Sequence, residues 1–268
     1  MKATTRFLAL APLFLAVLLL TSLPLPAQLY LQNFTNVNGS SSNTNSGSVG
    51  WSTYFATSTQ STSIVNQTTL STFSGDYSAI TNGLSNPSSA GYGFLAFVTN
   101  NSTTGVFGSV TSLGSGISVA NGTSINWVMG NNNTQSKIRL LVQVDGFWYA
   151  SSTTFSNIST NTVSSAATFK DANIVTNTYG LNFSTTAANW TSFTLDPGNA
   201  TMSLGTQMAT DLTSNLLTGI GFYAVDTGTA VVRLDTLQIV PEPTTYALIG
   251  LGIAVLGLSL RHRASRYS

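Results

Sequence analysis

Residues 137–151 carry the strict alternation of a β-hairpin, in the stretch KIRLLVQVDGFWYAS. Every second residue from position 138 to 144 is apolar, and a strand places such residues on one face. Asp145-Gly146 then supplies the two-residue turn that tight hairpins favour. The return strand begins at Phe147, so Trp148 and Tyr149 fall on opposite faces, and we expect one of them to be exposed. This stretch commits the chain to a β-sheet.

The rest of the body repeats this pattern without a helical period. A second hairpin is predicted from strands 217–225 and 230–240, joined by a turn at 226–229. Further short strands are predicted at 29–34, 51–56, 77–80, 93–99, 116–119, 124–129, 190–195 and 201–204. Segments 38–50 and 152–168, rich in Ser, Thr and Asn, are predicted to be exposed loops. These signals indicate a single all-β domain, a sandwich or a barrel.

Charged side chains make up only 6% of the chain, against about 25% in an ordinary soluble protein. Residues 28–240 hold four Lys or Arg and seven Asp, which gives this body a net charge of −3. Binding of nucleic acid needs a basic surface that neutralises phosphates. The body has no such stretch, so we expect no nucleic-acid partner.

The N-terminus reads as a secretory signal peptide over residues 1–27. Lys2 and Arg6 precede an apolar run at residues 7–20, and Ala27 is a plausible last residue before cleavage. The prolines Pro24 and Pro26 interrupt the segment, and the run is short for a membrane span. An uncleaved anchor is the alternative.

The C-terminus holds a second apolar segment, residues 244–260, which contains no charge. Its length fits a short transmembrane helix. The tail at 261–268 follows at once, and its basic residues Arg261, Arg263 and Arg266 should stay on the cytoplasmic side. The body would then lie on the opposite side of the membrane from the cytoplasm, as the N-terminal signal also predicts. The body, residues 28–240, therefore lies between two targeting segments.

Pro241-Glu242-Pro243 immediately precedes this span. Prolines fix φ, remove backbone donors and favour extended neighbours, so the motif should be open to a processing enzyme. The order of motif, short span and Arg-rich end over 241–268 resembles the PEP-CTERM sorting signal of Gram-negative bacteria. That resemblance implies an exosortase as partner, transient anchoring in the inner membrane with the body in the periplasm, and final delivery to the cell surface or extracellular matrix. A plain membrane anchor is the alternative.

The strand layout is similar to jelly-roll β-sandwiches of the lectin-like and carbohydrate-binding kind. The opening strand at 29–34, followed by Trp51, and the closing stretch VVRLDTLQIV carry this resemblance. It implies a jelly-roll-type β-sandwich for residues 28–240.

Catalysis finds little support in the residue types of the body, which has no His, Cys or Glu. A Ser-His-Asp triad and an imidazole zinc site are therefore excluded, and a glycosidase would need two Asp. We expect no enzyme, no catalytic residue and no cofactor. A structural calcium ion suits a chain rich in Asn and Asp, but no loop of the D-x-D type marks a site.

Two functions remain. The first is a non-enzymatic surface or matrix protein associated with exopolysaccharide. The alternative is a specific carbohydrate-binding module, in which an aromatic ring stacks on a sugar and Asp or Asn fixes its hydroxyls. The candidate residues are Trp148, Tyr149, Asp145 and Asp235. Trp51, Trp127 and Trp190 are further candidates, although rings of this size usually fill a core.

Overall fold

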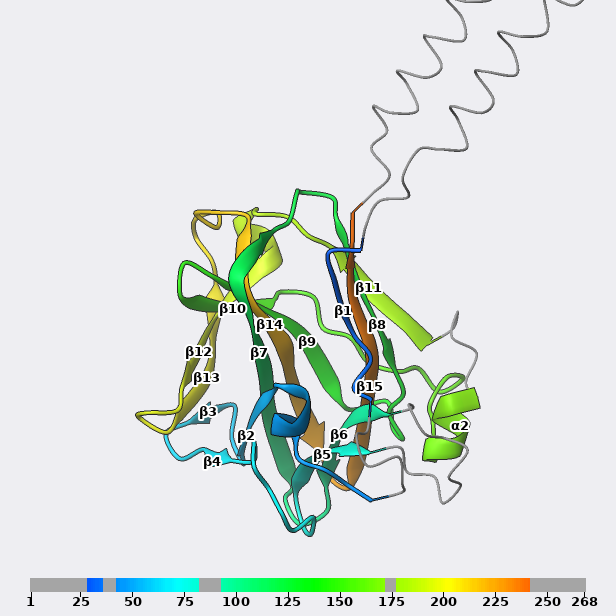
Figure 1. Ribbon diagram of the computed structural model, residues 1–268. Coiled ribbons are helices and arrows are strands. Elements are labelled where there is room, and N and C mark those ends of the chain that lie inside the picture. The colour runs from blue at the N-terminus through cyan, green and yellow to red at the C-terminus, as the bar shows by residue number, and fades with distance from the viewer. Residues whose placement is uncertain (1–27, 36–41, 82–92, 172–176, 242–268) are drawn as a thin grey trace, which may run out of the picture. The chain divides into compact units, whose positions relative to one another are not determined.

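The computed structural model describes residues 28–35, 42–81, 93–171 and 177–241. Residues Leu29–Val240 form one compact unit of two antiparallel sheets, seen as two layers in Figure 1. Sheet A has the order β11-β8-β15-β6-β5, with β1 also paired to β15. Its strands are β1 (Tyr30–Gln32), β5 (Tyr77–Thr81), β6 (Phe94–Thr99), β8 (Ser124–Met129), β11 (Thr178–Asn182) and β15 (Ala230–Val240).

Sheet B has nine strands in the order β3-β13-β12-β10-β9-β14-β7-β2-β4. They are β2 (Ser52–Ala56), β3 (Gln60–Ser61), β4 (Val65–Asn66), β7 (Thr104–Ser118), β9 (Lys137–Val144), β10 (Phe147–Ser151), β12 (Trp190–Asp196), β13 (Thr201–Gln207) and β14 (Leu216–Thr227). The helical turns are η1 (Ser46–Val49), α2 (Ala166–Asp171) and η3 (Ala187–Asn189).

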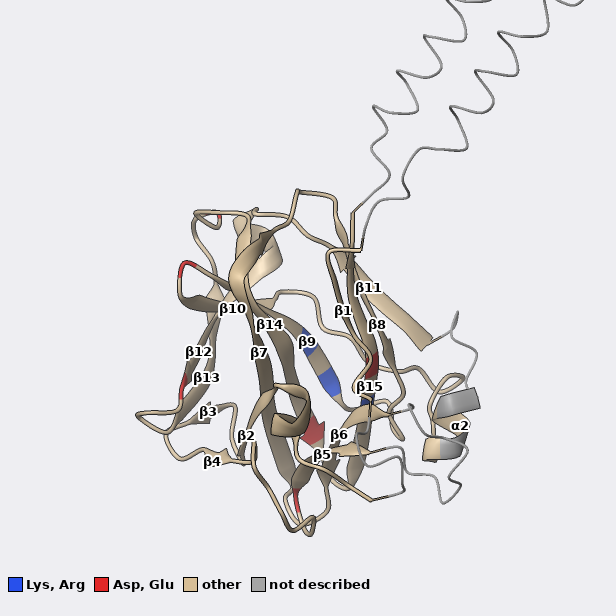
Figure 2. Ribbon diagram, viewed as in Figure 1, with Lys and Arg blue, Asp and Glu red and all other residues tan. Residues whose placement is uncertain are grey.

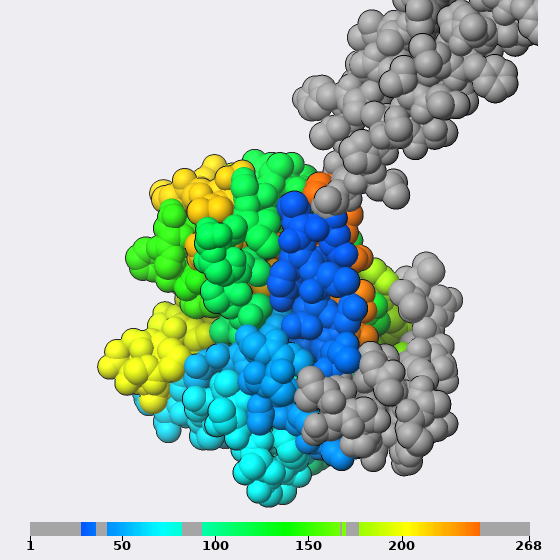
Figure 3. All heavy atoms as spheres, viewed as in Figure 1, coloured from blue at the N-terminus to red at the C-terminus, as the bar shows by residue number. Residues whose placement is uncertain are grey.

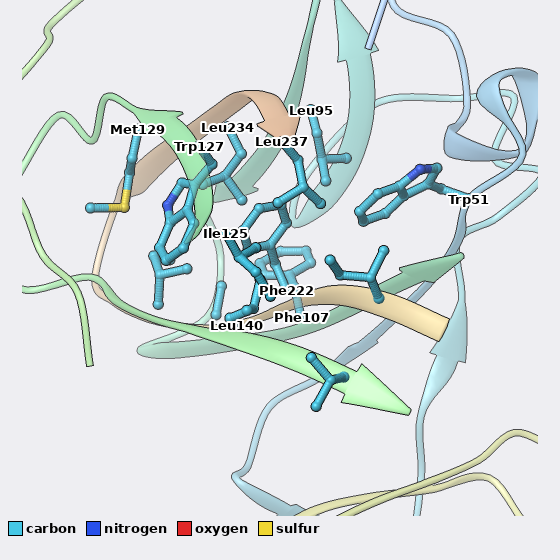
Figure 4. Close-up of a cluster of buried hydrophobic side chains, with 14 of the residues drawn as sticks. Trp51, Leu95, Phe107, Ile125, Trp127, Met129, Leu140, Phe222, Leu234 and Leu237 are labelled. Carbon is cyan, nitrogen blue, oxygen red and sulfur yellow. The ribbon is translucent and has the colours of Figure 1, made fainter. Parts of the chain in front are cut away.

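The main core lies between the two sheets. Alternate residues of β6, β8 and β15 face alternate residues of β9 and β14 and Phe107 of β7, and these apolar side chains are buried. Aromatic rings occupy the centre (Figure 4): Phe222 stacks on Trp51 at 6.1 Å between ring centroids and meets Trp127 edge-on at 5.6 Å. The alternation in residues 138–144 thus places its apolar face in this core, as the sequence predicts.

Sheet B also curves over its own outer face. Its two edge strands, β3 and β4, are separated in the chain only by residues 62–64. A Cβ added at Gly108 in β7 would lie 2.7 Å from the sulfur of Met202 in β13, although four strands separate β7 and β13 in the sheet. A second apolar cluster, which includes Phe193, Leu141 and Tyr223, fills this curved face. The outer face of sheet B is therefore covered largely by its own side chains.

A segment between β10 and β11 covers part of the outer face of sheet A. Phe169 in α2 packs edge-on against Phe94 in β6 at 5.2 Å. The guanidinium of Arg233 in β15 donates to the carbonyl of Val163 at 2.9 Å, which ties the segment to the sheet. Asn157, also buried, accepts a hydrogen bond from the backbone N–H of Asn131 at 2.8 Å.

The all-β prediction is confirmed, and most of the expected strands are present. Several local predictions are wrong. β7 begins at Thr104 rather than at 116, β14 continues to Thr227 through the start of the turn predicted at 226–229, and β3, β4 and β11 were not predicted. The segment 152–168 is not a plain exposed loop, because Asn157 and Val163 are buried in it.

The described residues contain no helix long and apolar enough to cross a membrane. The predicted signal peptide at 1–27 and the predicted span at 244–260 lie outside the residues that the structure describes.

Candidate functional site

The hairpin of β9 and β10 places three of the four candidate sugar-binding residues. Phe147 pairs with Val144, so only Asp145 and Gly146 form the turn. Their φ angles are +50° and +81°, as a turn of this type requires, and glycine reaches such a value without strain. The sequence-predicted hairpin is therefore confirmed, with Trp148 and Tyr149 directly after the turn.

Trp148 lies on the outer face of sheet B, opposite Gln143 of β9 and Phe193 of β12. Its ring packs on β14, because a Cβ at Gly219 would lie 2.7 Å from the Trp148 Cη2 atom. The neighbouring Gln143 amide accepts a hydrogen bond from the Thr218 hydroxyl at 3.1 Å. A half-buried indole thus lies beside an amide and a hydroxyl, groups that can contact a sugar ring and its hydroxyls.

Tyr149 points the other way, toward the core between the sheets, and is also half-buried. Burial raises its pKa, and the nearby Asp145 carboxylate raises it further. The prediction of opposite faces is correct, but the expectation that one of these two rings is exposed is wrong. The exposed aromatic ring of the hairpin is Phe147, which is 69% exposed.

Asp145 is held by the loop before β14, since the Thr213 hydroxyl donates to its Oδ2 atom. This hydrogen bond engages one carboxylate oxygen and fixes the turn against residues far away in the sequence. Asp145 lies in the same hairpin as Trp148 and Tyr149.

Asp235 is not part of that cluster. It lies on β15 in sheet A, opposite Val128, beside a bulge in the pairing with β8. Its Oδ1 atom accepts the backbone N–H of Thr236 at 2.7 Å, and burial raises the pKa of the carboxyl to about 7. The four predicted residues therefore do not form a single site, because Asp235 belongs to the other sheet.

The other three tryptophans fill the core. Trp51, Trp127 and Trp190 are each buried to 1% exposure or less. None of them can stack on a ligand from solvent, so Trp148 is the tryptophan that keeps an accessible edge.

Asp226 is a titratable residue that the sequence analysis wrongly assigned to a turn. Its position before a Thr-Gly turn indicated an exposed turn residue, yet it belongs to β14 and is fully buried. Burial raises its pKa to about 7, while hydrogen bonds from Ser136 and Thr99 act in the opposite direction. Its Oδ1 atom has no hydrogen-bond partner among the residues that the structure describes. The alternation of Ile220, Phe222 and Ala224 would have placed Asp226 on the core face if the predicted strand had been continued by one residue.

The described part of the chain brings together no group of three His, Cys, Asp or Glu residues that would hold a metal. It therefore assigns no site to the calcium ion considered from composition.

Strand β15 leads directly into the sorting segment. Val240 is its last residue and pairs with Ser124 of β8, and Pro241 follows at once. Glu242, Pro243 and the basic residues Arg261, Arg263 and Arg266 lie outside the described residues. The first residue of the motif is thus attached to a fully paired strand.

With its strand pairs all antiparallel and its core between two sheets, the body is a β-sandwich that ends at a sorting segment. Residues 240–264 match the family model described as the PEP-CTERM protein-sorting motif. The chain therefore carries a PEP-CTERM sorting motif, and this motif implies export and recognition by an exosortase.

Solved structures with similar folds include carbohydrate-binding modules. The family 11 module from Clostridium thermocellum in complex with a β-1,3-1,4-mixed-linked tetrasaccharide has a TM-score of 0.40 and 12% identity, over 72% of this chain and 89% of that one. The family 11 module of the cellulase Lic26A-Cel5E of Clostridium thermocellum has a TM-score of 0.39 and 11% identity, over 80% and 96%.

The arabinose-bound MgGH51 α-L-arabinofuranosidase has a TM-score of 0.39 and 13% identity, over 81% of this chain and 27% of the enzyme. Likeness of this extent does not bear on what the present chain binds. None of the curated proteins matches the chain.

Proposed function

We propose that this chain is a non-enzymatic, exported surface or matrix protein that an exosortase sorts and that associates with exopolysaccharide. The PEP-CTERM motif at 240–264 is the observation that carries this proposal. The composition supports it, since a body with so few charges presents a neutral surface of Ser, Thr and Asn. Such a surface suits a crowded polysaccharide matrix.

The proposal gives the chain three parts. Residues 1–27 act as a cleaved signal peptide, residues 28–240 form a jelly-roll-type ectodomain, and residues 241–268 form the sorting signal. In that signal, the helix at 244–260 crosses the inner membrane and the tail at 261–268 stays cytoplasmic. The body lies in the periplasm during this transit and afterwards at the cell surface or in the matrix of a Gram-negative cell.

Replacing Pro241, Glu242 and Pro243 together with alanine is expected to abolish processing in the native host. Loss of the two prolines restores φ freedom and backbone donors, so the segment no longer presents the extended form. Immunoblots of membrane and extracellular fractions should show the longer, membrane-bound form in place of the mature one.

Pro197→Ala is the matched control, because Pro197 lies in the exposed turn between β12 and β13. That variant should mature like the parent chain. Normal release of the triple-alanine variant would contradict sorting through the motif.

A second candidate function is specific carbohydrate binding. The geometry of Trp148 favours it: a half-buried ring lies over Gly219, next to the Gln143 amide and the Thr218 hydroxyl. Aromatic stacking and nearby hydrogen-bonding groups are the two elements of a sugar site. Asp145, at the turn of the same hairpin, extends this proposed site, whereas Tyr149 points toward the core on the opposite face.

For this second function, Trp148→Ala is expected to remove glycan retention on an array probed with the mature protein. Trp148→Phe should keep part of the signal, because a smaller ring still stacks on a sugar. Phe147→Ala is the control, since Phe147 is the hairpin's solvent-exposed ring and pairs with the core residue Val144. An array without any retained glycan would refute specific binding and leave the matrix role.

A further inference from the structure

The first and last strands of the body, β1 and β15, lie side by side, so the chain enters and leaves the sandwich at one place. Strand β1 pairs with the end of β15, with Tyr30 opposite Ile239 and Gln32 opposite Leu237. The Leu29 N–H also donates to the Ile239 carbonyl at 3.0 Å. Figure 3 shows the start of the described chain and its end meeting at the surface. We call this the terminal end of the sandwich.

The tether from this end to the predicted span is very short. Val240 is still paired in the sheet, and the predicted span begins at residue 244. A fully extended chain advances at most about 3.6 Å per residue, so the four steps from 240 to 244 reach about 14 Å. An anchored body therefore keeps its terminal end within about that distance of the membrane surface.

The strand register places further segments at the terminal end. Val240 pairs with Ser124, the first residue of β8, and residues 119–123 connect β8 to the end of β7. At the end of β7, Ser118 pairs with Leu216, the first residue of β14. Three residues further along β14, Gly219 pairs with Gln143 of β9, just before the β9–β10 turn. The start of β14 thus lies at this end, as Figure 1 shows, and the register places the β9–β10 turn on the same half of the sandwich, beyond β14.

Most of the exposed large apolar side chains lie on strands whose register places them toward this end. Leu29, Leu31, Leu216 and Phe147 are four of the six large apolar side chains that the described residues leave exposed. The other two are Ile158 and Val65. Phe147 has the largest exposed fraction and directly follows the β9–β10 turn.

The charges at the terminal end are few and already hydrogen-bonded. Asp145 accepts from Thr213, and Asp211 accepts the Ala187 N–H at 2.8 Å. Lys137 and Arg139 lie at the other end of β9, Arg233 lies opposite Ala96, and Lys170 is in α2. Figure 2 shows how sparse the charges are over the whole body. A contact made by this end would rest on apolar burial and not on attraction to anionic headgroups.

We infer that the terminal end is a membrane-contact surface, in which Phe147 and Leu216 enter the lipid interface while the chain is anchored. Phe and Leu side chains at a membrane surface are stabilised by burying their apolar area at the boundary between headgroups and acyl chains. The inference rests on the membrane-anchored transit proposed above. It adds that the body lies against the bilayer on a defined face instead of moving freely on a stalk.

Single-cysteine probes test this surface in the full-length chain, which contains no cysteine of its own. Phe147→Cys and Leu216→Cys, each labelled with an environment-sensitive fluorophore, are reconstituted into phosphatidylcholine vesicles. Ile158→Cys and Val65→Cys are the matched controls, since both positions are exposed and apolar but lie away from the terminal end. Flotation first establishes that the chain is bound to the vesicles.

The probes at 147 and 216 are expected to show a blue-shifted emission and loss of intensity when the lipids carry brominated acyl chains. The probes at 158 and 65 should emit as they do in water, and added salt should change neither pair. A chain that floats but shows the same emission at all four positions overturns the inference and leaves the sorting proposal intact. A chain that does not float contradicts both.

Discussion

Phe222→Ala is expected to lower the free energy of unfolding of the body by about 3–5 kcal/mol. The Phe222 ring is 0% exposed and lies between Trp51 and Trp127, so its removal loses apolar burial and leaves a cavity that large rigid neighbours fill poorly. Because the free energy of unfolding of a domain is only about 5–15 kcal/mol, this single change should remove a large part of the stability of the body.

Chemical denaturation of residues 28–240, followed by tryptophan fluorescence, measures this loss. Phe147→Ala removes the same side chain from a position that is 69% exposed, and it should change stability by less than about 0.5 kcal/mol. Equal losses in the two variants would show that Phe222 is not the centre of the core.

The stability of the body is expected to fall as the pH rises from about 4 to about 7. Burial raises the pKa of Asp226 to about 7 in the folded state, above its usual value near 3.9 in an unfolded chain. The folded state therefore binds more protons than the unfolded state in this window, and each step upward in pH favours unfolding. The loss is on the order of 4 kcal/mol, and it is complete above the folded pKa. Asp235, whose pKa is raised in the same way, acts in the same direction.

Asp226→Asn should remove about half of this dependence, because an amide carries no charge to desolvate while Asp235 still titrates in the same pH range. Unfolding midpoints at pH 5 and pH 8 measure the effect: the parent chain is less stable at pH 8, Asp226→Asn shows a smaller difference, and a variant that also carries Asp235→Asn is nearly equal at both. Asp196→Asn is the control, since hydrogen bonds from Asn199 lower the pKa of Asp196, which therefore stays ionised between pH 5 and pH 8. That variant should keep the slope of the parent chain. A parent chain equally stable at pH 5 and pH 8 would contradict the assignment.

The parts of the fold that sequence predicted are those fixed by short-range pattern. The β9–β10 hairpin follows from the alternation at 138–144 and from Asp145-Gly146, which need no information from distant residues. Strand β7 could not be found in this way, because Thr104–Ser118 holds four glycines and many serines and resembles a loop. Its place in sheet B depends on pairing with β14 and β2, strands from distant parts of the chain.

The candidate site shows the same division. Asp145, Trp148 and Tyr149 lie together because one hairpin carries them, whereas Asp235 was grouped with them on residue type alone and belongs to the other sheet. The exposure of Phe147 and the burial of Asp226 depend on where each strand ends relative to its neighbours. That register is set by pairing across the sheets, and single-sequence periodicity does not contain it.

The short edge strands of sheet B affect how readily two molecules can associate when the protein is concentrated. A long sheet normally offers two unpaired edges, and a neighbouring chain can add a strand to either of them. Here both edges are strands of two residues, β3 and β4, joined through residues 62–64. These two strands thus give a second molecule little backbone to pair with, and the edge that stays open in the described residues lies on β7 beyond Val110 and on β13 beyond Leu204. A protein with so little charge repulsion gains protection from edge-to-edge aggregation where its edge strands are short.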